Sequence, residues 1–198
     1  MIAPTATTEA PGDGRPATRP ARRLAWAAGV LVAVLATVFG GYAVAALLIE
    51  PAGAPVSVGG VVRVQPLTGW AFAGRYAVVG MPAARITRGN GNLDILGAAA
   101  GVPDELASMY VEEVLKPSAP RLEISEDLEQ VQLGGAAAGA RFAYVGVFDR
   151  GGAPIEGEVT VLVSRTGRGV IFDAWAPEGL LQYIRGDVET MQANAELV

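Results

Sequence analysis

The feature that most constrains this chain is an apolar stretch without any charged side chain, at residues 24–49. About 26 residues at a helical rise of ~1.5 Å each span roughly 39 Å, which exceeds the ~30 Å hydrocarbon core of a bilayer. A helix satisfies all its backbone hydrogen bonds internally, as a single segment that crosses lipid must do. The sequence therefore predicts a transmembrane helix over residues 24–49.

The charges on either side of this stretch indicate its orientation. A cluster of arginines precedes it, whereas Glu50 follows it and the next basic residue is Arg63. The cluster consists of Arg15, Arg19, Arg22 and Arg23. Because basic flanks stay on the cytoplasmic side, we expect a single-pass protein of the cell membrane. Residues 1–23 would form a disordered cytoplasmic tail, and residues 50–198 would lie outside the membrane.

A cleaved signal peptide is the alternative interpretation of the same stretch. Ala43 and Ala45 match the small-residue pattern that precedes a cleavage site. The apolar region of a signal peptide usually has about 7–15 residues, however, and this one is much longer. The length favours a retained anchor.

Small residues recur at every fourth position of the predicted span. The central ones are Gly29, Ala33, Thr37 and Gly41. Such a stripe lets two helices approach closely, which predicts a homo-oligomer formed through the span. The alternative is that the stripe only reflects a segment rich in Ala, Gly and Thr.

The remainder of the chain is predicted to form one acidic domain. Residues 50–60 are expected to be a connector, and residues 61–198 are enough for a single core. Residues 50–198 carry 11 basic and 18 acidic side chains, a net charge of −7. Nucleic acids and anionic lipid head groups need clustered Lys and Arg, so we expect neither as a partner of this domain.

The chain contains no cysteine and no histidine. It therefore lacks the residues of zinc fingers, cysteine nucleophiles and Ser-His-Asp triads. No stretch matches a phosphate-binding loop or a dinucleotide fingerprint. Glu156 and Glu158 share one face of a predicted strand, where we expect an exposed polar edge. The sequence thus predicts no catalytic residue, no cofactor and no metal site, and hence a protein that is not an enzyme.

Residues 61–198 are expected to fold as α+β, with a mostly antiparallel sheet packed by two main helices. A hairpin is predicted across Gly89, Asn90 and Gly91, because such residues tolerate positive φ. One helix should begin at Pro103 and stop before Pro117, and the second should begin at Pro177. Strands are expected at 61–64, 76–79, 84–88, 92–98, 122–125, 128–133, 141–148, 155–164 and 170–176.

The order of these signals resembles one family. A strand leads into Gly69-Trp70, a hairpin and an amphipathic helix with Tyr110 follow, and a long meander ends in GVIFDAWAP before a C-terminal helix. This order is similar to the PsbP-like family, which includes PsbP, Mog-type Ran-binding and DcrB-type proteins. The resemblance covers roughly residues 60–198. It implies an α/β/α sandwich and a membrane-anchored bacterial member that is not an enzyme and offers surfaces to protein partners.

Strand parity brings aromatic residues and one carboxylate to the same face of the sheet. A simple hairpin at RTGRG would place Val161 opposite Asp173, and the preceding one would place Phe142 opposite Val161. Tyr144 and Trp175 then share the face of Asp173, either hydrogen-bonded within the core or lining an open groove. The same two alternatives, packing within the core or lining a groove, apply to Trp70. The binding candidates are therefore Trp70, Tyr144, Asp173 and Trp175.

Two functions of different class remain open at this point. The first is a membrane-anchored extracytoplasmic module of the bacterial cell envelope that binds an envelope protein. The alternative is a binder of a small or lipidic ligand in a pocket between the sheet and the helices.

Overall fold

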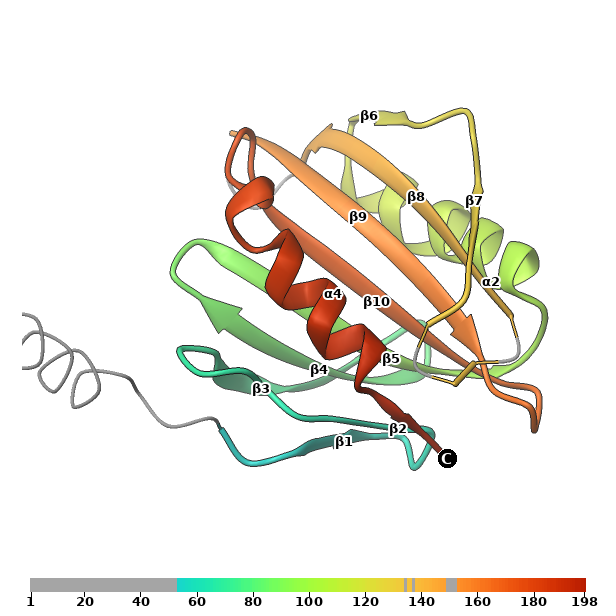
Figure 1. Ribbon diagram of the computed structural model, residues 1–198. Coiled ribbons are helices and arrows are strands. Elements are labelled where there is room, and N and C mark those ends of the chain that lie inside the picture. Colours follow the sequence, from blue (N-terminus) through green and yellow to red (C-terminus); the bar gives the residue numbers. More distant parts are fainter. Residues whose placement is uncertain (1–52, 134, 137, 149–152) are drawn as a thin grey trace, which may run out of the picture. The chain divides into compact units, whose positions relative to one another are not determined.

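The computed structural model describes residues 53–133, 135–136, 138–148 and 153–198 (Figure 1). The predicted tail at 1–23 and the predicted span at 24–49, with its small-residue stripe, lie outside the described residues. Within the described ranges, no helix combines the length and the apolar character that crossing a bilayer requires.

The main sheet has eight strands, in the order β3-β4-β5-β10-β9-β8-β6, with β7 also pairing with β8. All the neighbours are antiparallel, so the predicted α+β fold with a mostly antiparallel sheet is confirmed. The strands are β3 (Ala71–Val78), β4 (Met81–Arg88), β5 (Gly91–Ala100), β6 (Arg121–Ile124), β7 (Glu129–Val131), β8 (Ala138–Val147), β9 (Pro154–Val163) and β10 (Arg168–Pro177).

The predicted hairpin at Gly89-Asn90-Gly91 is confirmed. Strands β4 and β5 pair up to Arg88 and Gly91, which leaves a two-residue turn. Gly89 adopts a φ of 57°, in the left-handed region that a turn of this kind requires.

The first helix continues beyond the point where the sequence predicts its end. It consists of α2 (Pro103–Tyr110), a π-helical turn η1 (Val111–Leu115) and the short α3 (Lys116–Ser118). Pro117 therefore does not stop it. Proline breaks an α-helix because its ring meets the carbonyl one turn back, and the wider π turn immediately before it relieves this clash.

The second helix begins later than predicted. Pro177 is still paired in the sheet, opposite Ile155. Gly179, with a φ of 82°, then turns the chain. A short 3-10 turn, η2 (Leu181–Tyr183), precedes α4 (Arg185–Ala193). Pro177 is the last paired residue of β10, since proline has no N–H to donate to the ladder.

A second, three-stranded sheet was not predicted. It pairs β1 (Val56–Val58), β2 (Val62–Val64) and β11 (Glu196–Leu197), with β2 in the middle. Strand β1 lies within the predicted connector at 50–60. Val56, Val58, Val62 and Val64 are all buried, which gives these short segments the apolar contacts that two or three residues of pairing alone would lack.

Two apolar clusters cover the two faces of the main sheet. One joins the sheet to α4, η2 and the small sheet, and the other joins the opposite face to α2 and η1. Helix α4 and helix α2 accordingly lie on opposite sides of the strands (Figure 1). Strand β9 lies between β8 and β10 and contributes Val161 to one cluster and Leu162 to the other. The α/β/α sandwich that the resemblance implies is confirmed.

Candidate functional site

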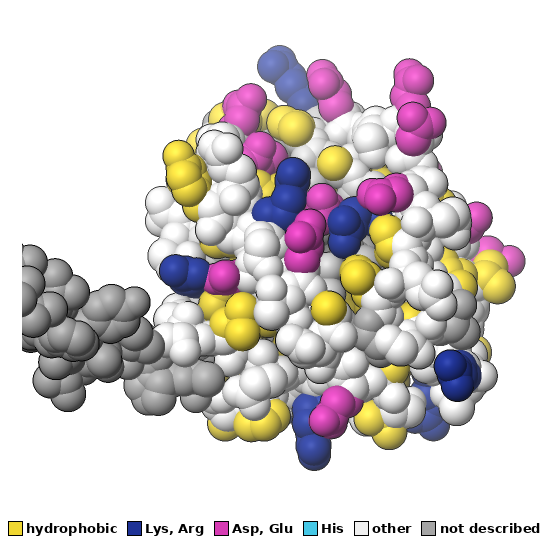
Figure 2. Space-filling model, viewed as in Figure 1, with side chains coloured by type: hydrophobic (Ala, Val, Ile, Leu, Met, Phe, Trp, Pro, Cys, Tyr) yellow, Lys and Arg dark blue, Asp and Glu magenta, His cyan; other side chains and the backbone are white. Residues whose placement is uncertain are grey.

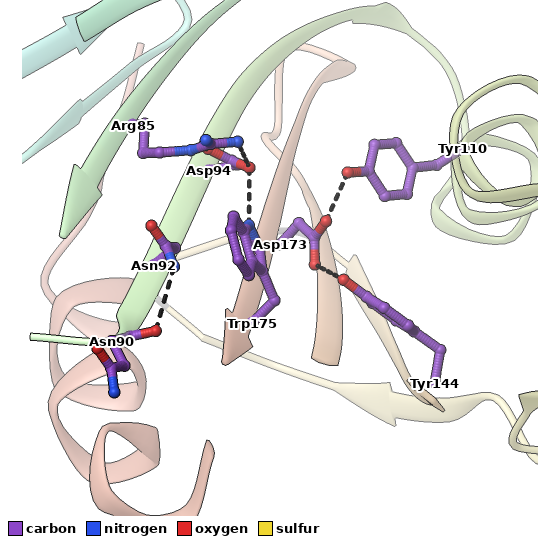
Figure 3. A network of polar contacts seen from close by, with 8 residues as sticks. All are labelled: Arg85, Asn90, Asn92, Asp94, Tyr110, Tyr144, Asp173 and Trp175. Atoms are coloured by element: carbon purple, nitrogen blue, oxygen red, sulfur yellow. Dashed lines mark hydrogen bonds and ion pairs between the residues drawn. The ribbon is translucent and has the colours of Figure 1, made fainter. Parts of the chain in front are cut away.

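A row of charged side chains crosses the sheet on the face below α2. Arg85 on β4 is the register partner of Asp94 on β5, and Asp94 is the partner of Asp173 on β10. These three side chains, with Trp175, Tyr110 and Tyr144, form the polar network of Figure 3. Charged groups in this position are unusual, because the rest of the face is apolar.

The predicted face is right, although the predicted register is not. Asp173 pairs with Val159, and Phe142 also pairs with Val159. Both expectations had placed Val161 in that position. The difference is two residues, and because side chains alternate with a period of two, Tyr144, Asp173 and Trp175 still share one face.

Arg85 and Asp94 form a two-point ion pair. The Arg85 Nε donates to Asp94 Oδ1 at 2.6 Å and Nη2 donates to Oδ2 at 2.8 Å. The Trp175 indole donates to the same Oδ2 at 3.0 Å. The guanidinium also lies over the rings of Trp175 and Tyr76, at 5.0 and 5.5 Å from their centroids. The hydrogen bonds to Asp94 raise the pKa of Arg85, so its charge is permanent.

Asp173 is held by two phenols. The Tyr110 hydroxyl donates to Oδ2 at 2.7 Å, and the Tyr144 hydroxyl donates to Oδ1 at 2.9 Å. Asp173 is only 4% exposed. Burial and the nearby Asp94 charge raise its pKa to about 7, against the opposing effects of the two phenols and of the Arg85 charge. Burial, and then the Asp173 charge, raise the pKa of both tyrosines, so they remain neutral donors.

Gly157 makes the Tyr144 contact geometrically possible. Strand β9 separates β8 from β10, and Gly157 is the register partner of both Tyr144 and Trp175. A Cβ at this position would overlap the Tyr144 ring. Without a side chain there, the ring lies across β9 and its hydroxyl reaches Asp173.

The network lines a cavity of about 510 Å³ between the sheet and the helical segment 103–118. Its walls combine charged, aromatic and aliphatic side chains, a composition typical of sites for small molecules. They are formed by Tyr76, Ala77, Val78, Arg85, Asp94, Leu96, Tyr110, Val114, Leu115, Ser118, Tyr144, Phe148, Ile155, Asp173 and Trp175.

Of the four binding candidates, the structure brings three together and separates the fourth. Tyr144, Asp173 and Trp175 line the cavity. Trp70 belongs to the apolar cluster on the opposite face of the sheet, is 3% exposed, and donates its indole hydrogen to Asp187 at 2.9 Å.

Three members of the network were not singled out from the sequence. Arg85 and Asp94 flank the Gly89-Asn90 turn symmetrically, so the register of this hairpin already places them opposite each other. Tyr110 was assigned only to the apolar stripe of its helix. Its distance of 63 residues from Asp173 in the sequence gave no local signal.

Glu156 and Glu158 are not the exposed polar edge that was expected. Glu156 Oε1 accepts the backbone N–H of Leu181 at 2.6 Å. Glu158 lies between Arg141 and Arg185, at 3.5 and 3.7 Å. Figure 2 shows basic and acidic side chains interspersed on the side of the molecule where α4 lies. These carboxylates connect η2 and α4 to the sheet through a hydrogen bond and an ion pair, which explains their partial burial.

The fold is similar to that of a protein of known structure. The solution structure of CyanoP, the cyanobacterial PsbP of Synechocystis sp. PCC 6803, superimposes with a TM-score of 0.52 over 73% of this chain and 92% of that chain, at 13% identity. The fold is PsbP-like. The expected resemblance is thereby confirmed at the level of the fold.

Two further structures are similar to this PsbP-like chain at lower scores. One is PA94 of Pseudomonas aeruginosa, a protein of unknown function described as a putative regulator, with 12% identity, coverage of 67% and 88%, and a TM-score of 0.39. The other is LpqN of Mycobacterium tuberculosis, described as involved in cell envelope biogenesis, with 14% identity, coverage of 74% and 85%, and a TM-score of 0.36. No protein-family model and no curated protein matches the sequence.

Proposed function

We propose that the chain is a non-enzymatic accessory module of a bacterial cell envelope. A single transmembrane helix at residues 24–49 would anchor it, with the PsbP-like domain outside the membrane. The uncharged stretch that follows a cluster of arginines supports the anchor and its orientation. The module would act by binding an extended segment of an envelope protein.

The observation that carries this proposal is the edge strand β3. It has eight residues, and β4 is the only strand of the described residues that pairs with it. Phe72 and Tyr76 on β3 are 51% and 37% exposed, and Val79 in the following turn is 54% exposed. An exposed edge with apolar side chains is the surface on which an extended segment adds as a further strand.

The geometry of the β3–β4 hairpin identifies the backbone groups available to such a segment. Val78 and Met81 flank a two-residue turn and are register partners, so they form a hydrogen-bonded pair. The bonding alternates along an antiparallel pair. The N–H and C=O groups of Ala77 and Arg75 therefore point away from β4, toward an incoming strand.

Because the chain has no cysteine, site-directed crosslinking tests this proposal. Ala73→Cys in the full chain, carrying a thiol-linked photo-crosslinker, is expected to give a protein adduct in intact cells. Tyr183→Cys, an exposed position on η2, is the matched control and should not give it. Adding Ala77→Pro removes one outward N–H without breaking the β3–β4 ladder, and should abolish the adduct. Equal adducts from both cysteines, or an adduct that survives Ala77→Pro, would contradict strand addition.

The cavity favours a second candidate function, the binding of a small ligand between the sheet and the helix. We expect the neutral probe 2-phenylethanol to shift the Trp175 indole N–H resonance of the full chain in detergent micelles. Val114→Trp places a large ring in the cavity and should remove the shift. A shift that is the same in both proteins would mean that the probe does not enter the cavity.

A further inference from the structure

The charges around the cavity do not balance. Arg85, Asp94 and Asp173 are the charged residues that line it. Arg85 and Asp94 neutralise each other through their two-point pair. The donors to Asp173 are the hydroxyls of Tyr110 and Tyr144, which carry no charge. When Asp173 is ionised, the set therefore lacks one positive charge.

The position of Asp173 makes this deficit costly. Asp173 and Asp94 are direct partners on adjacent strands, an arrangement in which like charges repel. Both side chains are buried, so water screens this repulsion little. Such a carboxylate is stabilised either by taking up a proton or by a cation that comes to lie beside it.

The groups that face Asp173 come from several elements of the fold. Asp94 and Arg85 face it from β5 and β4, and Tyr110 and Tyr144 face it from α2 and β8. The register partner on β9 is Val159. The π-helical turn η1 contributes Val114 and Leu115 to the cavity. Arg85 is the one basic residue among these groups, and both its hydrogen bonds go to Asp94, so no second positive charge is present to balance Asp173.

The walls favour an organic cation over a metal ion. Each carboxylate oxygen of Asp94 and Asp173 already accepts a hydrogen bond from Arg85, Trp175, Tyr110 or Tyr144. A metal ion would need several of these oxygens directly, and the described part of the chain holds no group of three carboxylates that could bind one. The aromatic and aliphatic side chains suit an apolar body, and aromatic faces attract cations.

We propose that the cavity is a binding site for a small organic cation, an ammonium group on an apolar body. The ammonium group lies beside Asp173, and the body packs against the side chains of the helical segment and of β3. This inference rests on the second candidate function, the binding of a small ligand in the cavity. It assigns the ligand's charge.

Three probes with the same phenyl body and different charge test the assignment. They are phenethylammonium, 2-phenylethanol and phenylacetate, titrated into the full chain in detergent micelles while the Trp175 indole N–H resonance is followed. We expect phenethylammonium to bind at least about tenfold more tightly than either of the other probes at pH 8. Because the ligand and a proton compete for the same carboxylate, its affinity should fall by about tenfold per pH unit below pH 7 and level off above it.

Two variants distinguish the effect of the Asp173 charge on binding from the effect of the cavity's shape. Asp173→Asn should remove the preference for phenethylammonium and its pH dependence, while 2-phenylethanol still binds. The control Asp127→Asn removes an exposed carboxylate that does not line the cavity, and should leave both unchanged. The wild-type charge series and pH series remain decisive if Asp173→Asn fails to fold.

The outcomes distinguish the two levels of the proposal. If 2-phenylethanol or phenylacetate binds as tightly as phenethylammonium, or if affinity does not change with pH, the cation assignment is overturned and the ligand-binding function stands. If none of the three probes shifts the Trp175 resonance, both are overturned.

Discussion

Gly157 shows how much of the site depends on a missing side chain. Its single hydrogen leaves the space that the Tyr144 ring occupies on its way to Asp173. A Cβ at this point would lie 2.2 Å from the nearest atom of the Tyr144 ring. The ring would have to leave its hydrogen bond, which would leave one oxygen of a buried carboxylate with one donor fewer.

We therefore expect Gly157→Ala to lower the free energy of unfolding by about 1–3 kcal/mol, the usual cost of overpacking a buried site. Gly186→Ala is the matched control, because a Cβ at this position in α4 meets nothing within 4 Å. Alanine is the better helix former, so the control should be neutral or stabilising by up to about 1 kcal/mol. Chemical denaturation of the full chain measures both, and equal effects would contradict the assigned role of Gly157.

The raised pKa of Asp173 makes stability depend on pH in a definite direction. Its value is about 7 in the folded chain, against 3.8 as the ordinary value. The folded state therefore holds this proton more tightly than the unfolded state, and its ionisation costs stability as pH rises from about 4 to about 7. Above pH 7 the cost is constant.

Asp173→Asn removes this ionisation and isolates its effect from those of other carboxylates. We expect the stability of the variant relative to wild type to improve by a few kcal/mol as pH rises from about 4 to about 7, and to stay level up to pH 8. Denaturation midpoints across this range measure the difference. If the stability of the variant relative to wild type fell as pH rises, the two phenols and the Arg85 charge would outweigh burial and the Asp94 charge.

Part of the site could be predicted at the scale of single residues. Strand parity is enough to bring Tyr144, Asp173 and Trp175 to one face, because a register error of two residues preserves the face. The register of the hairpin at the Gly89-Asn90 turn also predicts the Arg85–Asp94 pair, although the sequence analysis did not name it. Tyr110 could not be found in this way, since its contact with Asp173 depends on how α2 is placed over the sheet.

At the scale of elements, the turn between β3 and β4 carries local strain. Val79 and Gly80 form it with φ values of 48° and 77°, the conformation that favours Asn-Gly. Val79 is the one non-glycine residue with positive φ among those the structure describes. A β-branched side chain is poorly suited to this region, although it exposes an apolar group beside the proposed docking edge.

Val79→Asn should therefore raise the free energy of unfolding by about 1 kcal/mol, by relieving the left-handed strain. Val145→Asn is a comparable change of an exposed valine on the regular strand β8, where asparagine is disfavoured. It should be neutral or destabilising. Thermal unfolding compares the two, and a loss of stability in Val79→Asn would mean that the valine makes contacts worth more than the strain.

Elements with a strong periodic pattern were predicted well, and those defined by tertiary contacts were not. Alternation and the Gly-Asn-Gly turn give β4 and β5, and Pro103 gives the start of α2. Strands β1 and β11 have three and two residues, too few to show a pattern. The delayed start of α4 follows from the pairing of Pro177 with Ile155, which no local rule for proline anticipates.

At the scale of the whole molecule, the proposed topology has a direct test. We expect Tyr183→Cys, the chain's single thiol, to react with a membrane-impermeant maleimide in intact spheroplasts. A cysteine at Thr8 in the predicted tail is the matched control and should react only after the membrane is permeabilised. The reverse pattern, or equal labelling of both, would contradict an extracytoplasmic domain.

Asp173 also connects two layers of the fold. It accepts one hydrogen bond from Tyr110 on the helix and another from Tyr144 on the sheet. A protonated carboxyl must direct its own hydrogen toward an acceptor, so it cannot keep both phenols as donors in the same way. Acidification therefore changes the hydrogen bonds through which Asp173 joins α2 to β8 at the cavity.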